Sequence, residues 1–478
     1  MQKLAEINWS DFLKGEGQAD LIPSGGFSPR SYGLNLTKER GKLYFIEPET
    51  DIGGVTLTGN VIAMAYDRTL SGNDGYALDD AGNLYTIASN GTFALRQTMA
   101  GNTFARGNSD LLQLRVSGIS NNASLCSTFA TSETTIRMYG GANLDEGSET
   151  AGQAEWWTGL NSGVRHPLEI VEDRMFCGDF NLVHAWDSIS TTGSFVTLPP
   201  DVNITSLRKH PDGRTLLAFC GLSQNFGHTR GVGGRVYYID PSIKDWTREV
   251  ELEAQVEGTR VVGGVIYVTY GNNLGYFDGN GIKFIKKLSI ATTDTTTTNA
   301  VYSHQLAGME DTLLVASDYE ALAYGNLGAG NVFWRPYRSA GNRTITAMLY
   351  RGDNRMLYAY KTSAATEKLI QIDYDNIGVN GTFYTNHYFF DDFKNVKRID
   401  YLHDLTNSAG TSRFQLEYRK HSGGATEIIE DKTYTNESTN RTRIDCEIKT
   451  DVFQLYFVPT TDDIGITSLR IYGDAVKY

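Results

Sequence analysis

A short strand pattern recurs seven times along this chain, and it constrains the fold more than any other feature of the sequence. Each copy has four residues with a large apolar residue in fourth place, and the mean spacing between copies is 47.5 residues. The copies are residues 84–87, 136–139, 183–186, 236–239, 274–277, 321–324 and 369–372. A second apolar strand precedes each copy, usually after an acidic or glycine-containing turn such as Asp212-Gly213. Repeats of 40–50 residues with room for four strands are typical of propeller blades.

We therefore predict an all-β chain whose residues 43–385 form a β-propeller of about seven blades. The 50 glycines and 27 tyrosines, set against 10 prolines, favour many short strands joined by tight turns. A series of β-sandwiches would alternate without this period, and a β-helix would repeat at much shorter spacing. The Asp that follows four of the repeated strands (Asp187, Asp240, Asp278 and Asp373) is interpreted as a turn residue.

The two ends of the chain differ from the repeating middle. Residues 1–42 are predicted to form an extended arm, because residues 15–33 are rich in Gly and Pro and have few apolar side chains to bury. One short helix is expected at residues 9–13, and residues 44–46 are a candidate for the strand that closes the ring. Residues 386–478 alternate apolar and polar positions between polar loops, which predicts a small antiparallel β-sandwich.

Charge and cysteine content limit the partners and the compartment. The net charge of −13 argues against specific nucleic-acid binding, which needs a basic surface. The first residues lack the apolar core of a secretory signal, and no window is apolar enough to span a membrane. The four widely spaced cysteines are expected to be buried free thiols in a protein made in a reducing cytoplasm.

No arrangement of polar residues indicates catalysis, a metal or a cofactor. The eight histidines show no ligand spacing, and His184, inside a repeated strand, is interpreted as structural. Neighbouring carboxylates such as Asp391 and Asp392 point to opposite faces of a strand and cannot jointly flank one glycosidic bond. We therefore predict no enzymatic activity, with a polysaccharide-degrading enzyme as the alternative that would need a residue set not evident here.

Four aromatic residues are candidates for stacking against a sugar ring: Trp156, Trp157, Trp334 and Tyr337. Aromatic rings that stack on sugars must be exposed, whereas rings that pack between blades are buried. The two interpretations lead to different functions. If the rings are exposed, the chain is a glycan- or receptor-binding module; if they are buried, they only stabilise the blades.

The order of arm, irregular propeller and C-terminal β-domain resembles virion proteins of tailed bacteriophages, in particular nozzle or hub proteins of short tails. The features that carry the resemblance are the Gly/Pro-rich arm ending at residues 20–29, the lack of repeated enzyme-type blade motifs, and the C-terminal segments 389–399 and 466–473. The resemblance implies a non-catalytic structural component of the virion, made in the host cytoplasm. Its implied partners are copies of itself in a ring and neighbouring tail or portal proteins.

Overall fold

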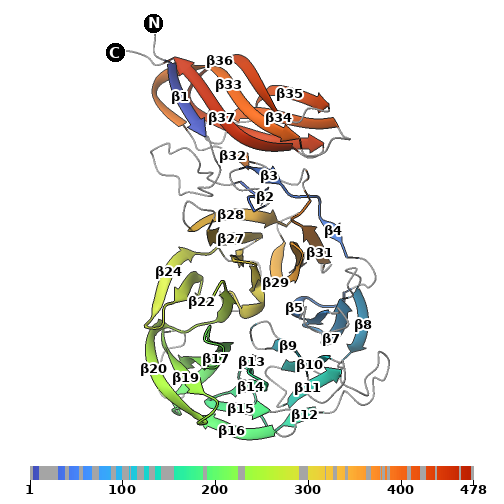
Figure 1. The fold of residues 1–478 in the computed structure, drawn as a ribbon, viewed down its shortest axis with the longest axis vertical. Coiled ribbons are helices and arrows are strands. Elements are labelled where there is room, and N and C mark those ends of the chain that lie inside the picture. Colours follow the sequence, from blue (N-terminus) through green and yellow to red (C-terminus); the bar gives the residue numbers. More distant parts are fainter. Residues whose placement is uncertain are drawn as a thin grey trace.

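The structure is a computed structural model, and it consists almost wholly of β-strands (Figure 1). The residues it describes are 4–9, 31–37, 42–52, 57–66, 75–87, 93–98, 107, 109–115, 123–128, 135–140, 155–186, 191–223, 232–289, 300–317, 319–326, 331–339, 343–361, 368–376, 378, 383–384, 388–405, 411–419, 427–435, 439–461 and 464–474. Within these residues the one helical element is a 3-10 turn, η2 (Ser303–Gln305).

Seven four-stranded antiparallel sheets form the blades of a propeller. The strands of blades 1 to 3 are β5 (Val61–Ala65), β6 (Gly75–Asp79), β7 (Asn83–Ile87) and β8 (Phe93–Thr98); β9 (Asp110–Arg115), β10 (Ala123–Thr128), β11 (Thr135–Gly140) and β12 (Glu155–Thr158); β13 (Leu168–Val171), β14 (Arg174–Asp179), β15 (Leu182–Trp186) and β16 (Thr191–Thr197). Those of blades 4 to 6 are β17 (Val202–Lys209), β18 (Leu216–Leu222), β19 (Val232–Asp240) and β20 (Asp245–Ala254); β21 (Gly258–Val262), β22 (Val265–Tyr270), β23 (Asn273–Phe277) and β24 (Ile282–Lys287); β25 (Leu306–Met309), β26 (Thr312–Ser317), β27 (Glu320–Asn326) and β28 (Asn331–Arg338).

Blade 7 combines the end of the repeat with a strand from the start of the chain. It contains β29 (Thr344–Gly352), β30 (Arg355–Lys361), β31 (Lys368–Asp373) and, outermost, β4 (Thr50–Asp51). Gln371 pairs with Thr50, and the Lys368 ammonium lies 2.6 Å from an Asp51 carboxylate oxygen. Ring closure therefore does use an N-terminal strand, but the prediction that residues 44–46 provide it was wrong. Those residues pair elsewhere, as described below.

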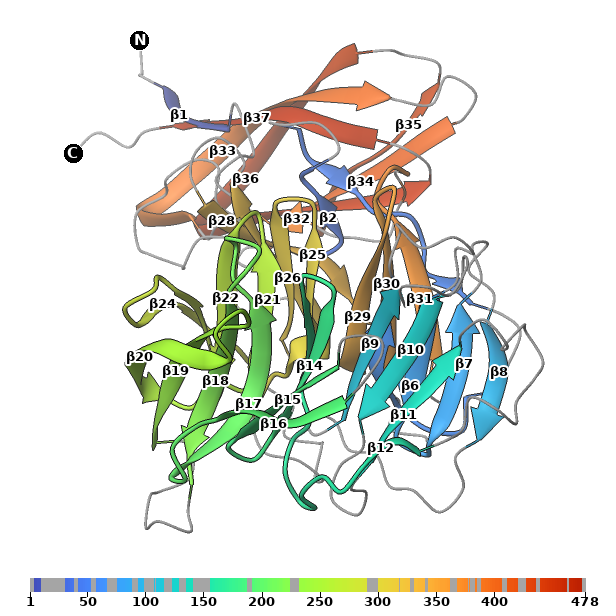
Figure 2. The same ribbon diagram turned by 60° about the horizontal axis from the view of Figure 1, so that its bottom comes forward.

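The first strand of each blade lines the axis. Each first strand lies beside that of the next blade, and β29 of blade 7 lies beside β5 of blade 1, which closes the ring (Figures 1 and 2). All seven predicted strand repeats fall in the third strand of a blade, so the repeat is confirmed strand by strand. The turn role is confirmed for Asp240, Asp278 and Asp373, whose side chains each accept a backbone N–H two residues further on. Asp187 lies outside the described residues.

The propeller has its apolar core between neighbouring blades rather than at the axis. Phe176 of blade 3 packs in one cluster with Leu207 of blade 4, and Phe219 of blade 4 packs in another with Ile266 of blade 5. Successive side chains of a strand point to opposite faces of the sheet, so each blade can pack apolar side chains against both of its neighbours. Removing apolar surface from water between blades is thus the main stabilising contribution to the ring.

Cys177 and Cys220 are buried free thiols within this core, and burial raises the pKa of the Cys220 thiol well above its usual range. Cys446 is a half-buried free thiol in the C-terminal sheet described next. The expectation of free thiols is therefore confirmed for these three. Cys126 lies on β10, and its side chain falls outside the described residues.

The C-terminal unit is a single bent sheet. Its strands, in spatial order, are β1 (Leu4–Trp9), β37 (Ile464–Asp474), β33 (Tyr388–Leu405), β36 (Thr439–Thr461), β34 (Thr411–Arg419) and β35 (Glu427–Thr435), with β32 (Phe383–Tyr384) beside β36. The first half of β36 pairs with β33 and the second half with β34. The sheet folds over itself along β36. This is shown by the Tyr401 ring on β33, whose centroid lies 6.2 Å from that of Phe457 in the second half of β36. The result is a small β-sandwich built from one sheet.

The predicted arm of residues 1–42 belongs to the fold of its own chain wherever it is described. β1 pairs antiparallel with β37, from Leu4 opposite Asp474 to Trp9 opposite Leu469. Trp9 is therefore in a strand and not at the start of the expected helix, whose residues 10–13 lie outside the described residues. The hairpin β2 (Leu34–Asn35) and β3 (Tyr44–Phe45) is buried. Pairing with a strand more than 450 positions away supplies the partner that the local sequence lacks.

The propeller and the C-terminal sheet share one apolar cluster. It contains Trp334 of blade 6, Met348 of blade 7, Phe45 of β3 and Leu469 of β37. Leu43, just before β3, exchanges two backbone hydrogen bonds of 2.9 and 2.8 Å with Ile466 of β37. The β2–β3 hairpin thus fills the junction between the two units (Figure 1).

Candidate functional site

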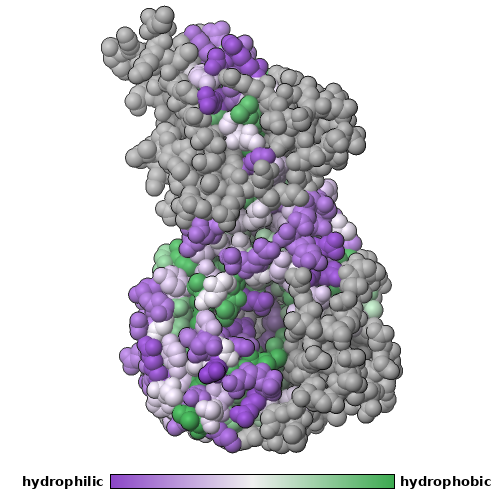
Figure 3. All heavy atoms as spheres, viewed as in Figure 1, coloured by the Kyte–Doolittle hydropathy of each residue, from purple (hydrophilic) through white to green (hydrophobic). Residues whose placement is uncertain are grey.

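A narrow hollow lies where the inner strands of the propeller converge. All seven blades, or the loops that lead into them, contribute to its wall. The lining residues are Ile62, Gly107, Ser109, Asp110, Arg165, Pro167, Thr205, Glu257, Tyr302, Ser303, His304, Gln305 and Thr346. The face of the propeller in Figure 3 is hollowed at its centre. We refer to this hollow as the axial site.

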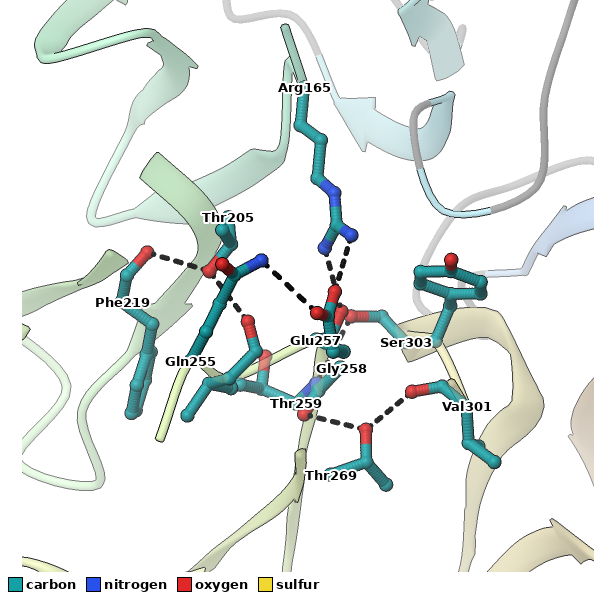
Figure 4. Close-up of polar contacts among 12 residues, drawn as sticks. Arg165, Thr205, Phe219, Gln255, Glu257, Gly258, Thr259, Thr269, Val301 and Ser303 are labelled. Atoms are coloured by element: carbon teal, nitrogen blue, oxygen red, sulfur yellow. Dashed lines mark hydrogen bonds and ion pairs between the residues drawn. The ribbon is translucent and has the colours of Figure 1, made fainter. Parts of the chain in front are cut away.

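Arg165 and Glu257 form an ion pair across the axial site. Arg165 precedes blade 3 and Glu257 precedes blade 5, so the pair spans the position of blade 4. A second Arg165 nitrogen donates to the Glu257 carbonyl oxygen at 3.3 Å, and the guanidinium lies 5.1 Å from the centre of the Tyr302 ring (Figure 4). Gln255 donates to the other Glu257 carboxylate oxygen at 3.1 Å. The Glu257 carboxylate is thus held on two sides.

His304 and Asp110 form a second link, between blades that are nearly opposite. His304 lies in η2 before blade 6, and its Nε2 is 2.6 Å from Oδ1 of Asp110, the first residue of blade 2. The other Asp110 oxygen accepts the Leu168 backbone N–H at 3.0 Å. Burial alone would raise the pKa of Asp110, but the hydrogen bond from His304 and nearby positive charges lower it. Asp110 is therefore ionised and paired.

A third link joins three consecutive blades. Arg208 of blade 4 contacts a Glu169 carboxylate oxygen of blade 3 at 3.1 Å and donates from Nε to the Thr259 carbonyl oxygen of blade 5 at 3.0 Å. The Ser206 and Thr259 hydroxyls are 2.6 Å apart. The Thr205 hydroxyl, shown in Figure 4, donates to the Val256 carbonyl oxygen at 2.7 Å. Side chains at the axis therefore form hydrogen bonds and ion pairs mainly with other blades. These contacts hold the inner strands of the ring in place relative to one another.

A buried group of titratable residues at blade 3 has a structural role. Asp179, 1% exposed at its side chain, has its two carboxylate oxygens 3.2 Å from Nε2 of His166 and of His184. Because His184 Nδ1 accepts the Ser194 backbone N–H, its Nε2 carries the proton and donates to Asp179. The Asn161 backbone and side chain donate to the same carboxylate. The interpretation of His184 as a structural histidine is confirmed.

Replacing Asp179 by asparagine is expected to lower the free energy of unfolding at pH 7 by roughly 3 kcal/mol, because an acceptor-only group is lost from between four donors. Burial by itself would raise the pKa of Asp179, but the hydrogen bonds from His166, His184 and Asn161 lower it well below its usual range. A carboxyl group whose pKa is lower in the folded than in the unfolded state stabilises the fold when the pH is above the unfolded pKa of about 4. This stabilisation is lost as the pH falls below that value. Urea denaturation of both proteins should therefore show a difference that is constant from about pH 7 to 5 and shrinks below about pH 4.

The matched control is Asp212→Asn in an exposed turn, where Asp212 accepts the Arg214 and Thr215 backbone N–H groups. Solvent can replace these bonds, so the control should lose much less stability at pH 7. Equal losses in the two variants would contradict a structural role for the buried cluster.

Two of the four predicted stacking aromatics are buried. Trp334 is 1% exposed and Tyr337 is fully buried on β28, where β2 lies against the strand. The Tyr337 hydroxyl donates to Glu49 at 3.0 Å, and its ring stacks on Tyr358 with centroids 4.4 Å apart. Of the two interpretations that the sequence left open, packing within the fold is therefore the one that these two rings have. Trp156 and Trp157 lie on β12, and their side chains are outside the described residues.

Sequence reasoning did not single out the axial residues. Arg165, Glu257 and His304 each come one to three positions before an inner strand, and Asp110 is the first residue of one. No motif marks them, because each is a single residue in a different repeat. Their position relative to the repeat was the available signal, since the loop before an inner strand must lie near the axis.

No family profile and no curated protein matches this chain. Among solved structures, one similar chain belongs to the crystal structure of a mitotic checkpoint complex, at 11% sequence identity and a TM-score of 0.41. The match covers 70% of this chain and 93% of that chain. Within the described residues, no helix is long and apolar enough to cross a membrane, and no three His, Cys, Asp or Glu side chains are grouped to hold a metal ion.

Proposed function

We propose that this protein is a non-catalytic structural component of a bacteriophage particle, in the tail or head–tail region, where it is a rigid scaffold within a multi-subunit assembly. The observation that carries the proposal is the set of ion pairs at the propeller axis. Arg165–Glu257 and His304–Asp110 join blades that are not neighbours, so they occupy the axial site with contacts that brace the ring. Such links favour rigidity over substrate turnover.

The way the two units are joined supports the same role. One apolar cluster continues from blades 6 and 7 into the C-terminal sheet, which couples the propeller to that sheet. Among the described strands, β1 and β35 lie at the two edges of the sheet. An edge strand has backbone donors and acceptors that a strand from another subunit can pair with. Copies of this chain and neighbouring tail or portal proteins are the proposed partners.

The proposal is tested on phage particles purified by density gradient from the lysate in which the gene is expressed. Mass spectrometry of the particles should find this protein at a fixed copy number relative to the major capsid protein, and immunogold labelling should place it at the tail or tail vertex. A particle fraction without the protein, while the soluble lysate contains it, would overturn the structural role. Cleavage or release of a polysaccharide by the purified protein would overturn its non-catalytic character.

A further inference from the structure

The outer strand of blade 4 carries a row of carboxylates at the rim of the propeller. Glu249, Glu251 and Glu253 alternate along β20 with buried apolar residues, so the three acidic side chains lie on one face of the strand, and all three are exposed. Glu249 lies opposite Tyr237, which packs in the cluster between blades 3 and 4, so this face is turned toward blade 3. Glu249 pairs with Arg235 at 3.2 Å. Among the described residues, no cation lies within ion-pair distance of Glu251 or Glu253. We refer to the three glutamates as the acidic rim.

The outer strand of blade 5 has the opposite charge. β24 contains three lysines and no acidic residue, in a chain whose net charge is −13. Lys283 lies opposite Tyr276, and Lys286 lies opposite the residue two positions before that tyrosine, so both lysines are on the face turned toward blade 6. Phe284, between them, is 60% exposed. The Lys283 ammonium lies 3.4 Å from an Asp278 carboxylate oxygen, and Lys286 lies over an aromatic ring of blade 6. We refer to Lys283 and Lys286 as the basic rim.

The two rims are held beside each other on the disc (Figures 1 and 2). Arg248, the one basic residue of β20, donates to the Gly279 carbonyl oxygen and to the Asn280 side-chain oxygen of blade 5, both at 2.8 Å. It lies on the opposite face of the strand from the acidic rim, so its charge is directed away from the glutamates. Among the described strands, none pairs with the outer edge of β20 or of β24. Two surfaces of opposite charge thus lie on neighbouring blades, fixed relative to each other and open to a partner.

We propose that the acidic rim binds the basic rim of a second copy of this chain. A two-fold axis parallel to the propeller axis places blade 4 of each copy against blade 5 of the other, so the same contact forms twice; a surface whose two halves complement each other is what such a contact needs. The rotation also brings the blade 3 side of one rim and the blade 6 side of the other onto the same side of the contact. The acidic and basic rims therefore meet side by side, and Phe284 is removed from water. The inference adds a surface to the proposed association between copies, but it rests on charge and geometry and not on the place of the protein in a particle.

The test is sedimentation velocity of the full-length protein over a range of protein concentrations. In low salt the wild type should sediment as a monomer–dimer equilibrium, and the dimer fraction should fall as salt is added, because exposed charges are screened. One variant reverses the acidic rim (Glu251→Lys with Glu253→Lys), and another reverses the basic rim (Lys283→Glu with Lys286→Glu). Each should raise the dimer dissociation constant by at least about 100-fold, because like charges then meet. An equimolar mixture of the two variants should restore the dimer, since each has the charge that the other lacks.

Glu172→Lys with Asp173→Lys is the matched control, because it makes the same change of charge as the acidic-rim variant in the exposed turn between β13 and β14. It should form the dimer as the wild type does. The melting temperature of each variant checks that it folds, and recovery of the dimer in the mixture requires both variants to be folded. A wild type that remains monomeric at every concentration in low salt would overturn the proposal. A dimer that both reversed variants still form, or a mixture that stays monomeric, would overturn it as well. None of these outcomes decides the particle experiment above, so the two proposals fail separately.

Discussion

Replacing Trp334 by alanine is expected to lower the free energy of unfolding by about 3–5 kcal/mol, the usual range for removing a fully buried tryptophan. Trp334 is 1% exposed and belongs to the cluster that joins blade 6, blade 7, the β2–β3 hairpin and the C-terminal sheet. Alanine leaves a cavity within this cluster. Because the lining comes from rigid strands, it can collapse only in part. The loss should appear as a lower urea midpoint with an unchanged slope.

Trp246→Ala is the matched control for this experiment. Trp246 is a half-buried tryptophan on β20, the outer strand of blade 4, where its ring contacts Tyr237 edge to face with centroids 5.3 Å apart. The same atoms are removed, but they leave a site that is already partly open to water. The control should therefore lose clearly less stability than Trp334→Ala. Similar losses in the two variants would contradict the junction as a principal stabilising element.

The propeller could be predicted from sequence because its repeat is carried by local residues. The last residue of the repeated pattern packs into the core, as Trp186 and Ile239 do, so a large apolar residue is needed at that place. The second strand and the turn between them add a further local pattern. A hairpin is encoded within about 15 residues, and seven copies at regular spacing indicate seven blades.

The sequence could not indicate which distant segments complete these units. β4 has two residues, Thr50 and Asp51, both exposed, so no apolar pattern marks it as a strand of blade 7. β1 pairs with the last strand of the chain, and neither partner contains a signal for the other. The sequence left open whether Trp334 is exposed or packed; in the structure β2 lies against β28, and Trp334 is buried. In each case, a contact between the beginning of the chain and a segment about 300 or more positions away decides the outcome.

The axial site is a further example, because its residues gain meaning only when the ring is closed. Arg165 and Glu257 are 92 positions apart in loops that read as ordinary polar turns. Their pairing depends on the radius of the ring and on which loop end faces the axis. Neither quantity is encoded in a local motif, so the pair could be found only in the structure.

Removing Arg165 is expected to be nearly as costly as removing Trp334. Its side chain is 9% exposed and that of Glu257 is 12% exposed, so Arg165→Met leaves a carboxylate largely shielded from water without its partner. Loss of one member of a fully buried ion pair lowers the free energy of unfolding by about 3–5 kcal/mol. Because both side chains keep some contact with water, we expect Arg165→Met to lie at the lower end, at about 3 kcal/mol. Methionine keeps an apolar chain against the Tyr302 ring, so the effect reports mainly on the lost charge.

A double-mutant cycle separates the pair from the single substitutions. Glu257→Gln alone also destabilises, but Arg165→Met together with Glu257→Gln should lose less than the sum, with a coupling of about 2 kcal/mol. The exposed pair Arg443–Asp445, whose Arg Nε and Asp Oδ1 are 3.0 Å apart, is the control and should show a coupling below about 1 kcal/mol that decreases with salt. The axial coupling should change little with salt, because ions do not reach a shielded pair. If both pairs showed the same small, salt-sensitive coupling, the axial pair would not brace the ring, and the rigid-scaffold proposal would lose the observation that carries it.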